Sequence, residues 1–381
     1  MLFFYFHMII KEVIDIHTAR EFLEVARQIY KDDNTWVCPL DKDVNAVFDS
    51  KQNVFHSHGS ITRWVLKSDE GKLIGRIAAF INEDKAYQAK QPTGGVGFFE
   101  CINDGRASNL LFNTAQAWLS AKGMKAMDGP INFGENDSFW GLLIEGFTTP
   151  SYGMNYNHSY YQKLFEDYGF VISYEQISNL LDVNKPFPER FTKIATWVSN
   201  KPGYTFKHLE AGKLEKFAAD FVEIYNDAWK DFANFVPLSI KKALEAFNKM
   251  KEVMDEKMIW FAYVKDEPAS VIVMLPDANQ MIKSFNGKLG LIQKLQFVYK
   301  RWKGVNRMRA VVMGTRPAFQ KHGLESALFI KLKEYVLPLN QYKEIELSWV
   351  GDFNEKMLAL HEAAGATFAK RHATMRKIFD D

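Results

Sequence analysis

Cysteine and long apolar runs are both scarce in this sequence. Its 381 residues include only two cysteines, Cys38 and Cys101, and neither belongs to a cluster with metal-ligand spacing. This scarcity excludes a disulfide framework, predicts no metal site and favours a reducing cytoplasm. The apolar start MLFFYFHMII lacks a basic region and a small-residue cleavage site, and Lys11 and Glu12 end it far short of the ~20 residues of a membrane span. We therefore expect MIIKEVIDI to form a strand rather than a targeting segment.

Excess charge is also lacking. The net charge is +2, which argues against a strongly basic nucleic-acid binder, so no nucleic-acid partner is expected. Hydrophobic residues make up 47% of the chain, which is enough to build real cores. Because domains typically hold ~100 to 200 residues, a chain of this length is expected to form two.

Acidic residues are absent from residues 278–324, whereas lysine and arginine recur there. Within this segment, residues 289–303 have the spacing of a helix with one apolar face, formed by Leu291, Ile292, Leu295, Val298, Tyr299 and Trp302. Three interpretations remain open: a helix packed on a sheet with a solvated basic face, an interfacial helix that docks on anionic lipid, and a nucleic-acid contact. The second predicts a cytoplasmic protein in peripheral contact with the inner membrane face.

A sequence pattern repeats between the two halves of the chain. NHSYYQKLFEDYGF (157–170) and NEKMLALHEAAGA (354–366) both run from Asn through Leu-x-Glu-x-x-Gly to an apolar residue. Each fits a helix with Asn near its start and Gly at its end. Each is preceded by a hairpin of apolar strands, a helix and a further strand. This order predicts an α/β fold with two domains, residues 1–184 and 185–381, joined near the proline-containing segment NKPFPERF.

This element order, closed by the Leu-x-Glu-x-x-Gly helix, resembles the GNAT family of acyl-CoA-dependent N-acyltransferases, here in tandem. The resemblance implies two GNAT-like domains, each with a mixed, twisted central sheet flanked by helices. The last stretch matches the family pattern Asn-x-x-Ala-x-x-Leu-Tyr-Glu-x-x-Gly-Phe at Asn354, Leu360, Glu362 and Gly365. His361 falls on the tyrosine, which in many members protonates the departing thiolate of coenzyme A.

A second family signature is a strand-to-helix loop of the form Gln/Arg-x-x-Gly-x-Gly/Ala, whose backbone amides hold the pyrophosphate of coenzyme A. Gln320 and Gly323 match its first two positions, and Glu325 replaces the last small residue. Free amides at a helix N-terminus attract anions. The resemblance implies acyl-CoA or acetyl-CoA as cosubstrate in the second domain, held by Arg316, Gln320, Lys321, His322, Gly323 and Asn354. The first domain lacks this loop and is expected to be degenerate or to form a wall for the other substrate.

The phrases GRIAAFIN, GFFEC and YNDAW are similar to those of bacterial tandem GNAT proteins proposed to form ceramide from a sphingoid amine. This resemblance implies an enzyme that transfers an acyl group from a thioester to an amine, with a lipid amine as acceptor. The alternative is a GNAT-fold protein that lost catalysis and recognises a lipid, an acyl-CoA or a protein partner. The sequence leaves open the acceptor, the acyl length, the oligomeric state and the effect of Glu325 on coenzyme A binding.

Acyl transfer to an amine needs a base for the ammonium proton, donors for the oxyanion and an acid for the thiolate. His361 is the acid candidate, since histidine titrates near neutrality. Its alternatives are a packed helix residue and a cation at a helix C-terminus. Glu100 in GFFEC and Glu346 in EIELSW are base candidates if they point inward, where burial raises the pKa of a carboxyl, and plain surface carboxylates if they point outward.

The loop INFGENDSFWG and a nearby tyrosine supply candidate substrate contacts: Asn132, Asn136, Asp137 and Tyr156. A solvated turn and an aromatic core residue are the alternatives. The sequence does not decide whether the two domains build one composite site from these residues.

Overall fold

The computed structural model describes residues 8–88, 90–231, 235 and 237–379. These residues form two compact units, each assembled from separate stretches of chain. Unit 1 contains the chain up to Gln176, Ile282–Leu295 and the chain from Lys370 onward, whereas unit 2 contains Ile177–Met281 and Gln296–Ala369. The domain boundary expected between residues 184 and 185 stays a prediction.

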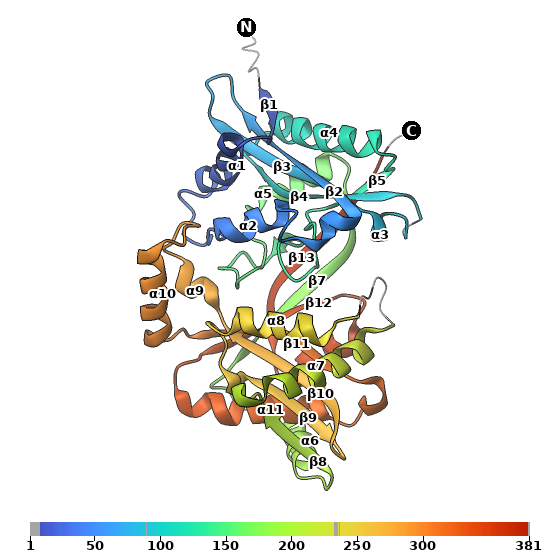
Figure 1. The fold of residues 1–381 in the computed structure, drawn as a ribbon, viewed down its shortest axis with the longest axis vertical. Coiled ribbons are helices and arrows are strands. Elements are labelled where there is room, and N and C mark those ends of the chain that lie inside the picture. The colour runs from blue at the N-terminus through green and yellow to red at the C-terminus, as the bar shows by residue number, and fades with distance from the viewer. Residues whose placement is uncertain (1–7, 89, 232–234, 236, 380–381) are drawn as a thin grey trace. The chain divides into compact units, whose positions relative to one another are not determined.

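Unit 1 is a mixed sheet with helices packed on it (Figure 1). Its elements are β1 (Ile9–Glu12), α1 (Ile16–Ile29), α2 (Asp41–Phe48), η1 (Val54–His58), β2 (Gly59–Lys67), β3 (Leu73–Asn82), α3 (Glu83–Ala86), β4 (Thr93–Cys101), α4 (Gly105–Ala121), β5 (Ala126–Gly129), β6 (Leu142–Glu145), α5 (Tyr160–Asp167), the start of β7 (Val171–Asp182) and the end of β13 (Thr367–Ile378). The strand order is β1-β2-β3-β4-β5-β13, and β6 also pairs with β13. Only β4 and β5 run parallel among these pairs.

Unit 2 repeats this plan. Its elements are the end of β7, α6 (Glu189–Ser199), β8 (Tyr204–His208), η2 (Ala211–Lys213), α7 (Leu214–Trp229), α8 (Ile240–Met250), η3 (Glu256–Met258), β9 (Ile259–Val264), β10 (Glu267–Pro276), most of α9 (Ala278–Ile282), the larger part of α10 (Leu291–Lys303), β11 (Arg307–Thr315), η4 (Pro317–Phe319), α11 (Leu324–Val336), η5 (Leu337–Leu339), β12 (Glu344–Gly351), α12 (Glu355–Ala363) and the start of β13. The order is β12-β11-β10-β9-β8. Here β11 and β12 form the parallel pair.

Alternation along the strands builds a core on each face of the unit 1 sheet. Val65 of β2 packs with Phe22 of α1 and Val44 of α2 on one face. Its neighbours Trp64 and Leu66 belong to the larger core that includes residues of α4 and α5. Successive side chains of a strand point to opposite faces, so helices on both faces bury β3 along almost its whole length.

The same alternation operates in unit 2. Phe261 of β9 joins a core with Phe217 of α7 and Phe247 of α8. The next residue, Ala262, joins a separate core with residues of α6 and α11, among them Phe329. Both units are therefore sheets covered on both faces, as expected for an α/β protein.

The parallel pair of strands in each unit is hydrogen-bonded only at its start. In unit 1 the pairing of β4 with β5 ends at Gly95 and Asp128, although β4 continues to Cys101. In unit 2 the pairing of β11 with β12 ends at Ala310 and Leu347, although both strands continue. Backbone groups that leave such a ladder need other partners, and a substrate can be one.

A β-bulge lies near the point where each parallel pair of strands stops pairing. The register between β3 and β4 shifts after Arg76, and Phe98 on β4 has φ 49°. The register between β10 and β11 shifts between Val273 and Met274. Bulges of this kind re-aim side chains and are frequent next to active sites.

Candidate functional site

The loop between β11 and α11 has the features of an anion site. Gly323, at φ 74°, is the N-cap of α11 and supplies no side-chain hydrogen bond to the helix. Glycine adopts this left-handed conformation without steric cost. The first N–H groups of a helix have no acceptor inside the helix, so they remain available to a ligand. Gln320 and Lys321, just before this point, are exposed, which suits binding of a phosphate group.

The charged residues around this loop partly oppose that role. Arg316 donates from Nε to Asp227 at 3.0 Å and from Nη1 to Glu223 at 2.6 Å, so α7 already provides its counter-charges. His322 lies 2.9 Å from the Tyr204 hydroxyl through Nδ1, and its ring stacks on that tyrosine. Glu325 adds a carboxylate to the first turn of α11. Anion binding would therefore depend on the backbone N–H groups and Lys321.

Helix α12 holds two of the predicted residues. Asn354 caps the helix, because its side chain accepts a hydrogen bond from the Met357 N–H at 3.3 Å. His361 is only 4% exposed, and Nδ1 lies 3.1 Å from Nδ2 of Asn179. An amide nitrogen can only donate, so Nδ1 accepts and the ring proton sits on Nε2.

Burial lowers the pKa of His361 from 6.5 to about 4. The imidazole is therefore neutral near pH 7, because desolvation disfavours its charged form. A pKa this low leaves almost no imidazolium to donate a proton near pH 7, and it also makes the neutral ring a weak proton acceptor. Its role as the acid stays a prediction.

Glu346 of β12 belongs to a buried ionic cluster. It is 1% exposed, and its Oε2 lies 3.8 Å from Nη1 of Arg307. Arg307 also lies 2.7 Å from Glu344 and 3.7 Å from Asp277. Glu346 is opposite Arg309 in the paired part of β11 and β12. It therefore lies one residue before the point where these strands stop pairing.

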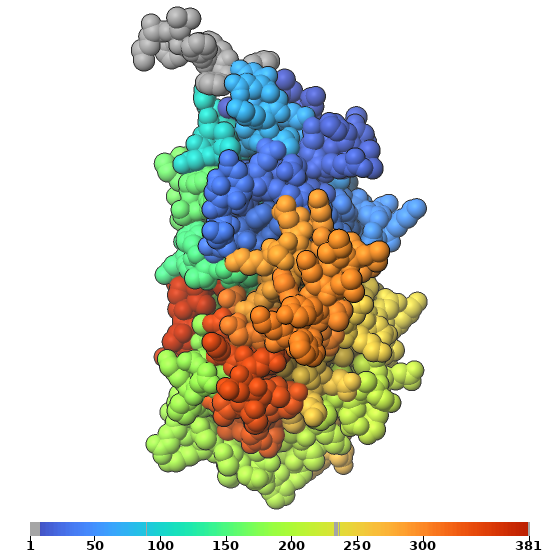
Figure 2. Space-filling view, turned by 90° about the vertical axis from the view of Figure 1, so that its left-hand side faces the viewer, coloured from blue at the N-terminus to red at the C-terminus, as the bar shows by residue number. Residues whose placement is uncertain are grey.

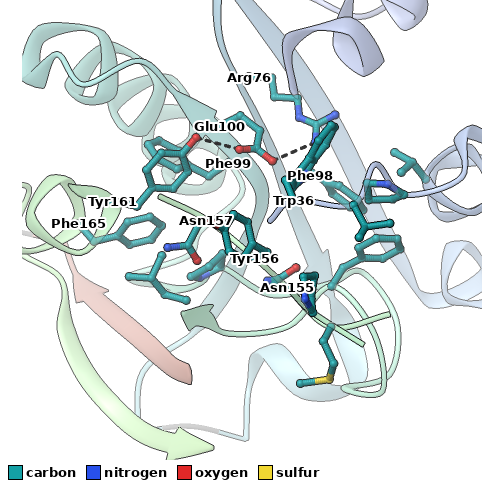
Figure 3. Close-up of a pocket in the computed structure, with 18 residues that line it drawn as sticks. Trp36, Arg76, Phe98, Phe99, Glu100, Asn155, Tyr156, Asn157, Tyr161 and Phe165 are labelled. Carbon is teal, nitrogen blue, oxygen red and sulfur yellow. Dashed lines mark hydrogen bonds and ion pairs between the residues drawn. The ribbon is translucent and has the colours of Figure 1, made fainter. Parts of the chain in front are cut away.

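Glu100 of β4 has the most elaborate surroundings of the predicted residues. Its Oε2 accepts hydrogen bonds from the hydroxyls of Tyr30, at 2.7 Å, and Tyr161, at 2.8 Å. Its Oε1 lies 3.3 Å from Nη2 of Arg76. Figure 3 shows the carboxylate between Arg76 and Tyr161. The side chain points inward, as a base candidate requires.

The electrostatics of this network favour proton uptake by Glu100. Burial raises the pKa of the carboxyl, while Arg76 and the two hydroxyls oppose the rise. Burial and the neighbouring carboxylate also hold the pKa values of Tyr30 and Tyr161 well above the ordinary value. Both tyrosines therefore stay protonated and keep donating to Glu100.

A cavity of about 60 Å³ adjoins Glu100. Trp36, Phe98, Tyr156 and Phe165 are among the residues of its mostly apolar walls (Figure 3). Small-molecule sites usually occupy roughly 300–1,000 Å³, so this cavity fits a few waters or the end of a substrate rather than a whole lipid chain.

The predicted substrate contacts are divided between this cavity and the protein surface. Tyr156 lines the cavity and donates to Asp33 at 2.7 Å. Asn136 and Asp137 are exposed on their loop, and Asn132 is buried. These three residues do not line the cavity. The structure thus brings Tyr156 close to Glu100 and leaves the loop residues elsewhere in unit 1.

None of the three side chains that contact Glu100, those of Arg76, Tyr30 and Tyr161, is among the site residues predicted from the sequence. Arg76 carries the one charge in the strand LIGRIAAFIN, and an isolated charge in an apolar strand is a usable signal of a buried partner. Tyr30 lies 70 residues before Glu100 and gave no such signal.

Two negative findings concern the described residues alone. In the ranges given above, no group of three or more His, Cys, Asp or Glu side chains could hold a metal ion. Across those same ranges, the structure contains no helix with the length and apolar character needed to cross a membrane.

The fold is similar to that of solved tandem GNAT proteins. The structure is similar to that of a tandem GNAT protein from the clavulanic acid biosynthesis pathway, with a TM-score of 0.57 and 12% sequence identity. The match covers 98% of this chain and 100% of that protein. The expected α/β fold with GNAT-like domains in tandem is thereby confirmed.

Two relatives extend the comparison at the level of sequence. The bacterial ceramide synthase of Caulobacter vibrioides is 27% identical over 378 residues, covering 96% of this chain and 97% of the relative. Protein YghO of Escherichia coli is 26% identical over 375 residues, covering 97% of this chain and 95% of the relative. No family model matches the chain. Together, the tandem GNAT fold and the ceramide synthase relative support an N-acyltransferase.

Proposed function

We propose that this protein is an acyl-CoA-dependent N-acyltransferase whose acceptor is a lipid amine of the sphingoid type. Full-length similarity to a bacterial ceramide synthase supports both the reaction and the lipid acceptor. The observation that carries the proposal is the N-terminus of α11 at Gly323, which has no side-chain cap. It follows β11, the strand that stops pairing with β12, after one loop that contains η4. A lipid acceptor implies that the reaction takes place at a membrane surface. The same proposal therefore includes peripheral contact with the inner membrane face through residues 289–303.

In this proposal, the amides of Lys321, Gly323 and the start of α11 hold the pyrophosphate of the cosubstrate. The amides of Gln320 and His322 already donate to the Pro317 and Phe319 carbonyls, each at 3.3 Å. Lys321 adds a positive charge, and His322 is held beside them by Tyr204. Arg316 ties the loop to α7 through its two carboxylate partners. Asn354 contributes through the start of α12, which it caps.

The reaction requires a neutral amine. Its nitrogen attacks the thioester carbonyl, the carbon–sulfur bond breaks, and the thiolate takes up a proton. Backbone N–H groups on β11 beyond Ala310, where pairing with β12 ends, are suitable donors for the oxyanion. Glu100 in unit 1 and Glu346 in unit 2 are the candidate bases, and His361 is the candidate proton carrier for the thiolate.

A thermal-shift titration with coenzyme A and a long-chain acyl-CoA tests the cosubstrate. A ligand at about 100 times its Kd stabilises the folded state by about 2.7 kcal/mol. Gly323→Glu should abolish this stabilisation, because it places a carboxylate at the loop and a side chain where even a Cβ would lie 3.0 Å from Val198. Gly203→Glu is the matched control: its φ is +81°, and a Cβ there meets only Lys265, at 3.7 Å.

The outcomes separate the alternatives. Stabilisation in the wild type and in Gly203→Glu, together with its loss in Gly323→Glu, supports the site. No stabilisation of the wild type by either compound would overturn it. Binding without release of free coenzyme A in the presence of a sphingoid amine would instead favour a non-catalytic binding protein, the alternative that Glu325 in the first turn of α11 supports.

A further inference from the structure

The apolar side chains of α10 face outward. Leu291, Ile292, Leu295, Val298, Tyr299 and Trp302 are each between 58% and 83% exposed, and the helix has no buried residue. At ~100° per residue these six positions fall within about one third of the helix circumference. In Figure 2 the orange part of the chain that contains α10 lies at the surface on the face turned to the viewer. A continuous apolar stripe of this kind on a surface marks an interaction site.

The opposite side of α10 attaches the helix to the protein. Phe297 packs against a buried core of unit 2. Lys300 donates to the Met281 carbonyl at 3.0 Å, and Arg301 donates to the Glu252 carbonyl. These contacts fix the rotation of the helix, so the apolar stripe cannot turn inward without breaking them.

Basic residues border the stripe. Lys294 lies along one margin and Lys303 along the other, and both are exposed. Exposed Lys283 and Lys288 precede the helix, and residues 278–324 contain no acidic residue. Lysine is depleted at the centres of protein–protein interfaces, whereas cations beside an apolar face are typical of helices that lie in the interface of an anionic membrane.

From this arrangement we infer that α10 is a membrane-docking element that lies parallel to an anionic bilayer. The apolar stripe enters the boundary between headgroups and acyl chains, with Tyr299 and Trp302 at the depth that such amphipathic rings favour. Lys294 and Lys303 bind phosphate groups of the lipids on either side. This inference does not depend on the acyl-transfer reaction, and it goes beyond the peripheral contact proposed above by naming the helix face, its orientation and the charge of the lipid.

Flotation of the full chain with vesicles tests the inference. One set of vesicles contains phosphatidylcholine alone, and the other contains phosphatidylcholine mixed with phosphatidylglycerol. The wild type should float with the anionic vesicles and much less with the neutral ones, and added salt should release it. Lys294→Gln and Lys303→Gln should each lower the partition coefficient about fivefold.

Two matched variants separate the stripe from apolar exposure in general. Leu295→Ser combined with Trp302→Ser should lower the partition coefficient at least tenfold, since two large apolar groups leave the contact. Trp197→Ser removes a tryptophan that is 63% exposed on α6 and should leave partitioning unchanged. Because all three side chains are exposed, the variants should keep the melting temperature of the wild type, which serves as the folding check.

Three results would overturn the inference. The first is no binding of the folded wild type to anionic vesicles. The second is equal binding by the stripe variant and the wild type. The third is a wild type that sediments as a dimer and a stripe variant that sediments as a monomer, because a second copy of the chain would then cover the face.

Discussion

His361 should make the protein sensitive to acid in a way that its buried position predicts. The folded-state pKa is lowered from 6.5 to about 4. A group whose pKa is depressed by folding contributes stability that is complete above the unfolded pKa and is lost as the pH falls through the folded one. Each pKa unit corresponds to about 1.4 kcal/mol, so the full effect of the fall from 6.5 to about 4 is about 3.5 kcal/mol.

Most of this loss falls in a practical pH range. Between about pH 7.5 and about pH 5, protonation of His361 in the unfolded chain lowers the free energy of unfolding by about 2 kcal/mol. Urea unfolding at these two pH values measures the change. His361→Gln, whose amide oxygen can still accept from Asn179, should reduce the loss by that amount.

Asn179→Leu is the control. It removes the 3.1 Å hydrogen bond but leaves the imidazole, so it should lower stability at both pH values and keep the acid sensitivity. Equal acid sensitivity in the wild type and in His361→Gln would refute the argument. It would mean that the imidazole is more accessible to water than its 4% exposure implies.

Two further predictions concern Glu100. If Glu100 is the base, Glu100→Gln should lower kcat/KM by a factor on the order of 10²–10⁴. The acidic limb of the pH–rate profile, which reflects a Glu100 pKa raised above 4.5, should also disappear. If Glu346→Gln causes a loss of this size and Glu100→Gln does not, the base is Glu346 in unit 2. Arg76→Met should destabilise the protein by about 3–5 kcal/mol in urea unfolding, because it leaves a buried carboxylate without its counter-charge. Adding Glu100→Leu should restore most of that loss, and a double variant no more stable than Arg76→Met would contradict the assignment of a buried ion pair.

Much of the fold could be predicted from the sequence because the pattern that repeats in the two halves is formed by residues close together in the chain. The helix that starts at Asn354 and the turn at Gly323 depend on capping and on a left-handed glycine, which short stretches of sequence specify. The bulge at Phe98 and the end of pairing at Ala310 depend on the register between distant strands. That information is not local, so the shape of the candidate site could not be predicted.

The candidate residues show the same limit. Glu100 lies between Phe99 and Cys101, and apolar neighbours on both sides do not tell to which face of the strand its side chain points. The hydrogen bond that the Tyr30 hydroxyl donates to Glu100 shows that this side chain points inward. That bond joins two segments that no local sequence pattern connects. For α10 the sequence identified the apolar stripe correctly, yet a helix packed inward and one turned outward have the same periodicity. The packing of Phe297 and the hydrogen bonds of Lys300 and Arg301 show which side of the helix faces the protein.

The exchange of segments between the units has a consequence for how the protein is made. β5 pairs with residues 375–378 of β13, and Ala373 and Met375 lie in the same buried core as Leu111 of α4. Unit 1 therefore cannot complete its sheet until these residues have left the ribosome, although most of its chain is synthesised first. Until then the edge of β5 that later pairs with β13 has unpaired backbone groups, the kind of edge on which strands of other chains can pair.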